Sequence, residues 1–238
     1  MNELLKGIRA VVFDAGNTLT HPDWQRVTAQ TEKHFALRCD ETSLQRSICK
    51  VLREADGDVD FLRSLARKSI PANWHFRRVY GDLGLDEAQQ AQLSSVLDAL
   101  HAERHLWTAL NEEAVPVLEE LKRRELRLGV VSNSEDGRVA ELLRTIDIFH
   151  FFDACIDSHL VEYAKPDSRI FLHAVNQLGV EPREAIYVGD SYTQDISGAR
   201  EAGLRAVLYD PLDLQPQANT LRIHSLTELI SSSMKQQY

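Results

Sequence analysis

The chain is poor in cysteine and has no long apolar run. Its 238 residues include three cysteines, Cys39, Cys49 and Cys155, and they form no Cys-x-x-Cys pair. Neither a disulfide framework nor a zinc site built on cysteine pairs is therefore indicated. No stretch approaches the ~18 consecutive apolar residues that a membrane helix needs. We expect no partnership with a membrane.

Positive charge is also in short supply. Lys and Arg number 27 against 36 Asp and Glu, which gives a formal net charge of -9 at pH 7. Such a surface repels a phosphate backbone, and Lys and Arg form no dense block, so no nucleic-acid partner is expected. The opening residues lack the basic region, apolar stretch and cleavage site of a signal peptide, and the expected location is the cytoplasm. Nothing in the sequence indicates the oligomeric state.

What is present is an ordinary globular composition, 43% hydrophobic and 26% charged residues, arranged in two patterns. In residues 1–20 and 108–238, short apolar runs alternate with helical segments. Alternating strands and helices predict a parallel sheet covered on both faces, that is, a doubly wound, Rossmann-like α/β core. The predicted strands lie at residues 9–14, 126–131, 154–156, 186–188 and 206–208 and near Leu221, and helices are predicted at about 112–124 and after Ser225.

The intervening residues 21–107 show only helical periodicity. Breaks are expected at Asp56-Gly57, at Ile70-Pro71 and from Gly81 to Gly84. The pattern predicts four or five helices without a strand, an all-helical domain inserted directly after the first strand. Its apolar stripes are Trp24, Val27, Thr31 and Phe35; Leu44, Ile48, Val51 and Leu52; and Leu93, Val96, Leu97 and Leu100.

Polar residues follow the predicted strands in a definite order. Asp14 ends the first strand, Ser132 ends the strand after the insertion, and Lys165 lies in the next loop. Asp190 and Asp195 follow the run at 186–188. In an open parallel sheet, ligands bind beyond the carboxyl ends of the strands, so these residues indicate one negatively charged pocket. Oxygen ligands of this kind suit Mg²⁺.

This order resembles the haloacid dehalogenase-like (HAD) hydrolase superfamily across essentially the whole chain. The helical insertion then corresponds to the cap of that superfamily, and it is expected to exclude bulky substrates. The four matching motifs are Phe13-Asp14-Ala15-Gly16-Asn17-Thr18-Leu19, Ser132-Asn133, Lys165-Pro166, and Gly189-Asp190 through Asp195.

The resemblance implies a Mg²⁺-dependent phosphatase that acts on a small phosphorylated metabolite. Asp14 would be the nucleophile and form an aspartyl-phosphate. Mg²⁺ would be held by Asp14, the Gly16 carbonyl and Asp190, with Asp195 close by or joined through water. The ion is needed because a carboxylate does not approach a phosphate dianion without charge neutralisation.

The resemblance also assigns residues to the phosphoryl group. Lys165 would hold both Asp14 and the phosphoryl oxygens as a point charge. The Ser132 hydroxyl and the Asn133 amide, together with Asn17, would bind the same group. Taken singly, each residue has a structural alternative: a strand-end Asp or Ser often caps a helix, and a loop lysine is often only solvated. The combination in this order favours the functional interpretation.

Gly16 departs from the pattern and leaves alternatives open. Phosphatases of the superfamily usually carry a second Asp there as general acid and base, a group typically worth ~10²–10⁴ in rate. Dehalogenases lack it but need no metal. Phosphonatases lack it and use a cap lysine as a Schiff base, for which Lys33, Lys50 and Lys68 are candidates. A catalytically weak binding or regulatory protein is the third alternative, and some sugar-phosphate phosphatases share the Gly-Asn pair.

Polar residues of the insertion are ambiguous. His101 and His105 are four residues apart and could bind a metal, but no third ligand is evident. His21 follows the first motif and could face the pocket. The cluster from Trp74 to Arg78 could contact a substrate, or its aromatic residues could be core while its arginines are solvated.

Overall fold

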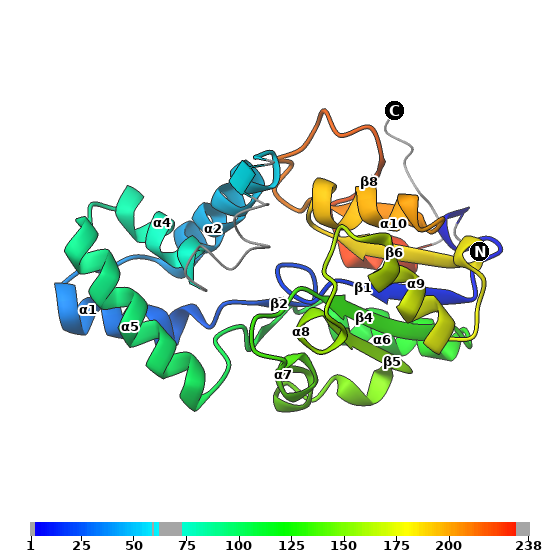
Figure 1. The fold of residues 1–238 in the computed structure, drawn as a ribbon, viewed down its shortest axis with the longest axis horizontal. Coiled ribbons are helices and arrows are strands. Elements are labelled where there is room, and N and C mark those ends of the chain that lie inside the picture. The colour runs from blue at the N-terminus through cyan, green and yellow to red at the C-terminus, as the bar shows by residue number, and fades with distance from the viewer. Residues whose placement is uncertain (1–2, 59, 62–72, 232–238) are drawn as a thin grey trace. The chain divides into compact units, whose positions relative to one another are not determined.

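The computed structural model describes residues 3–58, 60–61 and 73–231 (Figure 1). The chain divides into a core unit, Met1–Thr20 with Leu110–Tyr238, and a helical unit, His21–Ala109. The boundary predicted from the sequence, 107/108, lies two residues before the second boundary between these units. The expected break at Ile70-Pro71 and the candidate Lys68 lie outside the described residues.

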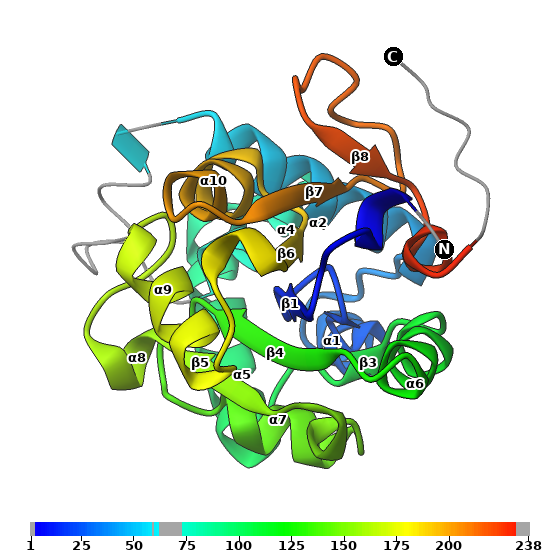
Figure 2. The ribbon, with the colours of Figure 1, turned by 90° about the vertical axis from the view of Figure 1, so that its right-hand side faces the viewer.

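A six-stranded parallel sheet forms the middle of the core unit, in the order β5-β4-β1-β6-β7-β8 (Figure 2). The predicted α/β class with a doubly wound parallel sheet is confirmed. The strand order reverses between β1 and β6, and ligands bind at such a switch point. The strands are β1 (Ala10–Phe13), β4 (Arg127–Ser132), β5 (Ala154–Asp157), β6 (Ala185–Gly189), β7 (Arg205–Tyr209) and β8 (Leu221–Ile223).

Helices cover both faces of this sheet because successive strand residues point to opposite sides. From β1, Val11 and Phe13 join the apolar cluster under α6 (Ala114–Arg123) and α7 (Val139–Thr145). Ala10 and Val12 join the cluster under α9 (Ser168–Gln177) and α10 (Gly198–Glu201). A single turn, α8 (Ser158–Val161), follows β5. All four residues of β1 are fully buried, so the strand that carries Asp14 is fixed from both faces.

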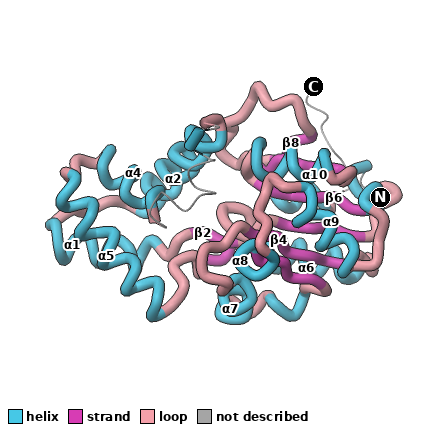
Figure 3. Tube along the Cα trace, viewed as in Figure 1, coloured by secondary structure: helices cyan, strands magenta, loops and turns pink. Residues whose placement is uncertain are grey.

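The helical unit contains α1 (Trp24–Phe35), α2 (Glu41–Asp56), α4 (Trp74–Asp82) and α5 (Glu87–Glu103) among its described residues (Figure 3). Asp23, Asp40 and Asp86 begin helices by accepting a backbone N–H with their side chains. The predicted stripes meet in one core, with Phe35, Leu52 and Leu100 packed half-buried at its margin, whereas Val96 is half-buried but not part of that cluster. The buried members include Trp24, Val27, Leu44, Ile48, Val51, Phe76, Leu93 and Leu97.

Two short features differ from the sequence-based expectation. β2 (Thr20–His21) pairs with β3 (Ala109–Leu110) where the chain passes between the units, and two residues are too few to show a strand period. Between Ser225 and residue 231, where the described part of the chain ends, the predicted helix is a 3₁₀ turn, Leu226–Leu229. Within the described ranges, no helix has the length and apolar character needed to cross a bilayer.

Two histidines of the helical unit are held neutral by burial. The His75 Nε2 atom is buried without a hydrogen-bond partner, and its ring contacts Trp74, Phe76 and Trp107. Burial, with a smaller contribution from the charge of His101, lowers the pKa of His75 from 6.5 to about 3. Burial lowers the pKa of His21 to about 4. Between these values and the unfolded pKa, the unfolded chain binds more protons, so stability is lost as the pH falls.

Replacing His75 with Phe should remove part of this pH dependence, because Phe keeps the ring packing and does not titrate. Between pH 7 and pH 5 the wild-type protein should lose on the order of 2 kcal/mol more unfolding free energy than His75→Phe. Urea unfolding at several pH values measures the difference. Equal losses of unfolding free energy between pH 7 and pH 5 in the wild type and in His75→Phe would contradict the lowered pKa of His75.

Candidate active site

A buried ammonium group joins two carboxylates beyond the carboxyl ends of β1 and β6. The Lys165 Nζ atom lies 2.5 Å from Asp14 Oδ1 and 2.7 Å from Asp195 Oδ1. The three side chains are almost wholly withdrawn from solvent. A buried charge is stable only when it is paired and hydrogen-bonded, and here each group meets that condition. The structure thus brings together three of the residues that the sequence singled out.

The charges of this group shift one another's pKa values. Burial is the largest influence on Asp14 and raises its pKa from 3.8 to about 6, while Lys165 opposes the shift and Asp195 adds to it. Burial alone would lower the pKa of Lys165, but Asp14 and Asp195 together outweigh it and raise that pKa above its usual range. The ammonium therefore stays charged, since the neighbouring carboxylates compensate for its lost hydration.

Asn133 fixes the backbone of Lys165. Its Oδ1 atom accepts the Lys165 N–H at 2.8 Å, and its Nδ2 donates to the Lys165 carbonyl at 3.1 Å and to Gln194 at 2.8 Å. Asn133 follows Ser132, the last and nearly buried residue of β4. The side-chain amide thus holds the lysine segment, so the expected phosphate contact of Asn133 would fall to its backbone N–H.

Two glycines allow the loops of the site to approach one another. A Cβ atom on Gly189 would overlap the Asp195 carboxylate, which accepts the Ser191 N–H at 3.0 Å. A Cβ atom on Gly198 would lie 2.6 Å from the Pro166 carbonyl oxygen. The glycine of the fourth motif therefore lets the Asp195 carboxylate reach the end of β6, and Gly198 lets the lysine loop close over α10.

Three carboxylates form a group that suits a divalent cation. One carboxylate oxygen from each of Asp14, Asp190 and Asp195 lies within 4.8 Å of the others. The donors are all oxygen, and the three carboxylates share one neighbouring ammonium, which contacts Asp14 and Asp195, so the group has excess negative charge. A hard ion such as Mg²⁺ prefers donors of this kind, and the residues present fit it.

The loop after β1 places the other predicted residues of the first motif. Asn17 is buried and adopts a left-handed backbone conformation, with φ of 53°. Gly16 forms an isolated bridge with Thr20. Asn111 secures the loop by donating from Nδ2 to the Thr18 carbonyl at 2.9 Å. Since Asn111 also reaches the Tyr209 hydroxyl at 3.1 Å, it ties the loop to β7.

Other carboxylates near the ends of strands have structural roles. Asp157, at the end of β5, accepts the N–H groups of His159 and Val139. Asp210, directly after β7, accepts those of Leu214 and Gln215. Backbone donors thus occupy both oxygens of each carboxylate. A strand-end Asp is therefore not sufficient evidence for a site, and its acceptors must be examined.

Tyr187 was not identified from the sequence as part of the site. It lies in β6, and its hydroxyl is 3.3 Å from Lys165 Nζ and 3.2 Å from Asp195 Oδ1. Tyr is a common strand residue, and its place inside the run Ala185–Val188 indicates only core packing. The one available signal was its hydroxyl, since a buried Tyr O–H usually needs a polar partner.

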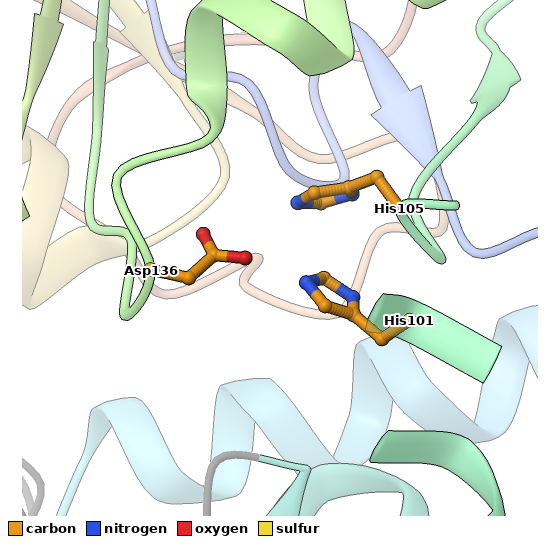
Figure 4. A group of neighbouring side chains, drawn as sticks. All are labelled: His101, His105 and Asp136. Carbon is orange, nitrogen blue, oxygen red and sulfur yellow. The ribbon is translucent and has the colours of Figure 1, made fainter. Parts of the chain in front are cut away.

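His101 and His105 of the helical unit are not arranged as a pair of metal ligands through Nδ1. Their rings are 4.4 Å apart (Figure 4), and each Nδ1 accepts a backbone N–H, from Leu106 and Trp107 respectively. In the neutral rings, Nε2 then carries the proton. Asp136, also labelled in Figure 4, belongs to the core unit.

The aromatic-basic cluster of the helical unit serves packing in part. Phe76 belongs to the core of the unit, Trp74 packs against Phe61 with ring centroids 4.6 Å apart, and Arg78 pairs with Glu54 at 3.2 Å. Arg77 is half-buried.

Comparisons with known proteins agree with this fold. The model of the haloacid dehalogenase-like hydrolase family matches residues 8–203. A glyceraldehyde 3-phosphate phosphatase of Methanopyrus kandleri is 28% identical over 208 residues, which are 84% of this chain and 83% of that protein. A phosphoserine phosphatase of Thermus thermophilus is 36% identical over 152 residues, 61% of this chain and 60% of that one.

A solved structure gives the same result in three dimensions. The HAD phosphatase from Thermococcus onnurineus has a TM-score of 0.60 and 26% identity, covering 93% of this chain and 96% of that one. The family match spans most of the chain, and the sheet order places the matching motifs at one edge of the core. The protein is therefore a member of the haloacid dehalogenase-like hydrolases.

Proposed function

We propose that the protein is a Mg²⁺-dependent phosphatase of small phosphorylated metabolites that works through an aspartyl-phosphate on Asp14. The observation that carries the proposal is the buried contact of Lys165 with Asp14, beside the carboxylates of Asp190 and Asp195. Relatives named as phosphatases support the same reaction class.

Asp14 is the group that attacks. One of its oxygens forms a bond to phosphorus while the bond to the leaving oxygen breaks, and water then hydrolyses the resulting acyl phosphate to regenerate the carboxylate and release phosphate. Lys165 keeps Asp14 ionised and faces the charge on the phosphoryl oxygens. Ser132, the backbone N–H of Asn133, and Asn17 supply further polar contacts.

Asp14, Asp190 and the Gly16 carbonyl would hold the Mg²⁺ ion. When bound, the ion supplies the charge neutralisation that lets a carboxylate approach a phosphate group. Asp195 would contact the ion less directly, because its Oδ1 already faces Lys165 and its Oδ2 accepts the Ser191 N–H. We therefore assign Asp195 chiefly to the orientation of Lys165.

The described lysines of the helical unit disfavour a phosphonatase. A Schiff-base lysine needs a desolvated or cationic setting that keeps its amine nucleophilic. Lys33 is exposed on α1, and Lys50 is exposed on α2, 4.0 Å from Glu54. Lys68 lies outside the described residues. The acidic group at Asp14, Asp190 and Asp195 disfavours a metal-free dehalogenase, because three carboxylates need a compensating cation.

Replacing Asp14 with Asn should abolish turnover while the protein stays folded, because an amide is a poor nucleophile for phosphorus. We expect a loss on the order of 10⁴-fold or more in kcat for an aryl phosphate assayed with Mg²⁺. Asp157→Asn is the matched control, since Asp157 also ends a strand but caps backbone N–H groups. It should cost stability and leave kcat largely unchanged. Substantial turnover by Asp14→Asn would refute the nucleophile assignment.

Replacing Asp190 with Ala should raise the Mg²⁺ concentration needed for activity and sharply reduce the maximal rate. Mg²⁺ sites of this type have few protein ligands, so the loss of one strongly weakens the binding of the ion. A Mg²⁺ titration of aryl phosphate hydrolysis measures both effects. An unchanged titration midpoint would place the metal elsewhere.

Replacing Gly16 with Asp should speed the hydrolysis of alkyl phosphates by up to ~10²-fold and that of aryl phosphates much less, because only poor leaving groups need an acid. Gly16 is not among the glycines with a positive φ, so its backbone conformation does not by itself exclude a side chain. Gly16→Asn, which has the same shape but no acid, is the control. The measurement is the slope of log(kcat/KM) against leaving-group pKa. A flat slope in the natural protein would show that another acid already acts.

A further inference from the structure

The ammonium group of Lys165 has all three of its hydrogens engaged by the protein. Its acceptors are Asp14 Oδ1 at 2.5 Å, Asp195 Oδ1 at 2.7 Å and the Tyr187 hydroxyl at 3.3 Å. A lysine ammonium has three donors and no acceptor. A ligand oxygen that binds Lys165 must therefore displace one of these three partners.

The hydroxyl of Tyr187 is the partner that leaves most easily. The two carboxylates are charged and close, and hydrogen bonds between ionised groups are roughly twice as strong as neutral ones. The Tyr187 oxygen is neutral and lies farther away, beyond the usual length for a strong N–H···O bond. Replacing the Tyr187 contact with a ligand oxygen therefore costs less free energy than displacing either carboxylate.

Tyr187 can release Lys165 without losing its own hydrogen bond. Its hydroxyl proton can be donated to the Val131 carbonyl at 3.1 Å or to Asp195 Oδ1 at 3.2 Å. The residue is fully buried, and its ring meets the edge of Phe171 with centroids 4.9 Å apart. The oxygen therefore stays in place when the ammonium turns away.

We propose that Tyr187 is a positioning residue that holds the third N–H of Lys165 in the resting enzyme and yields it to an incoming phosphoryl oxygen. The inference rests on the proposed function, which makes a phosphoryl group the ligand. In this arrangement the hydroxyl aims the ammonium and also competes weakly with phosphate. Removing the hydroxyl therefore has opposite effects on the stability of the empty protein and on phosphate binding.

The test is the binding of inorganic phosphate to Tyr187→Phe by calorimetry in the presence of Mg²⁺. Loss of the competing acceptor should tighten phosphate binding by ~2–10-fold, the equivalent of one net hydrogen bond, and should lower the stability of the ligand-free protein. A purely structural role predicts weaker or unchanged phosphate binding together with the lost stability. Either of those results would overturn the inference.

Tyr80→Phe is the matched control, because Tyr80 is also fully buried but lies in the helical unit. Its phosphate affinity should equal that of the wild type, and the same tightening in this variant would also overturn the inference. A second measurement uses the wild-type protein labelled with ¹³Cζ-tyrosine. Phosphate should shift the Tyr187 resonance and leave that of Tyr80 in place. An unmoved Tyr187 resonance would refute the proposal even if Tyr187→Phe did not fold.

The failure of this inference differs from failure of the proposed function. A wild-type protein that binds no phosphate and hydrolyses no phosphate ester refutes both. A wild-type protein that binds phosphate and turns over, with Tyr187→Phe binding phosphate no more tightly, refutes only the role of Tyr187.

Discussion

The buried ammonium of Lys165 is the interaction on which the rest of the site depends. Asp14 and Asp195 lie in a dry part of the sheet edge, where two unpaired carboxylates would repel each other and lose hydration. Removing one member of such a buried group typically costs about 3–5 kcal/mol. The Asn133 side chain and the close approach at Gly198 both serve to place this one charge. The same contacts thus stabilise the fold and fix the Asp14 carboxylate, the proposed nucleophile.

The strand-end carboxylates show how one sheet edge combines structural and chemical roles. Asp157 and Asp210 give both of their oxygens to backbone N–H groups, which fixes the loops that follow β5 and β7. Asp14 instead accepts a hydrogen bond from the Lys165 ammonium, whose positive charge can also contact a bound anion. Asp210 also pairs with the Arg222 guanidinium at 3.3 Å, so a cationic partner alone does not distinguish Asp14 from a capping carboxylate, and the sequence reveals neither kind of donor.

Much of the fold was predictable because its signals are local. Apolar runs such as Ala10–Phe13 are buried on both faces, as is usual for strands of a parallel sheet. The order of the motifs can be read directly along the sequence. The pairing of β2 with β3 was not predictable, because two-residue strands have no period. Tyr187 was missed for a different reason. Its hydroxyl contacts Lys165, which lies 22 residues earlier in a separate loop, so the contact is not local in sequence. The register of β1 with β4 and β6 sets that proximity, and no local pattern encodes it.

The glycine at position 16 gains a physical meaning from the charges around it. Three carboxylates already lie together at Asp14, two of them on the Lys165 ammonium, and a single divalent cation would balance the remaining charge. A fourth carboxylate in the same loop would have to be protonated, or the site would again carry excess negative charge. A general acid there requires a strongly raised pKa, which burial and like charge supply at the cost of stability. With Gly16 the loop avoids that conflict, and in the proposed reaction the departure of the leaving group would depend on the chemistry of the substrate rather than on a proton held by this loop.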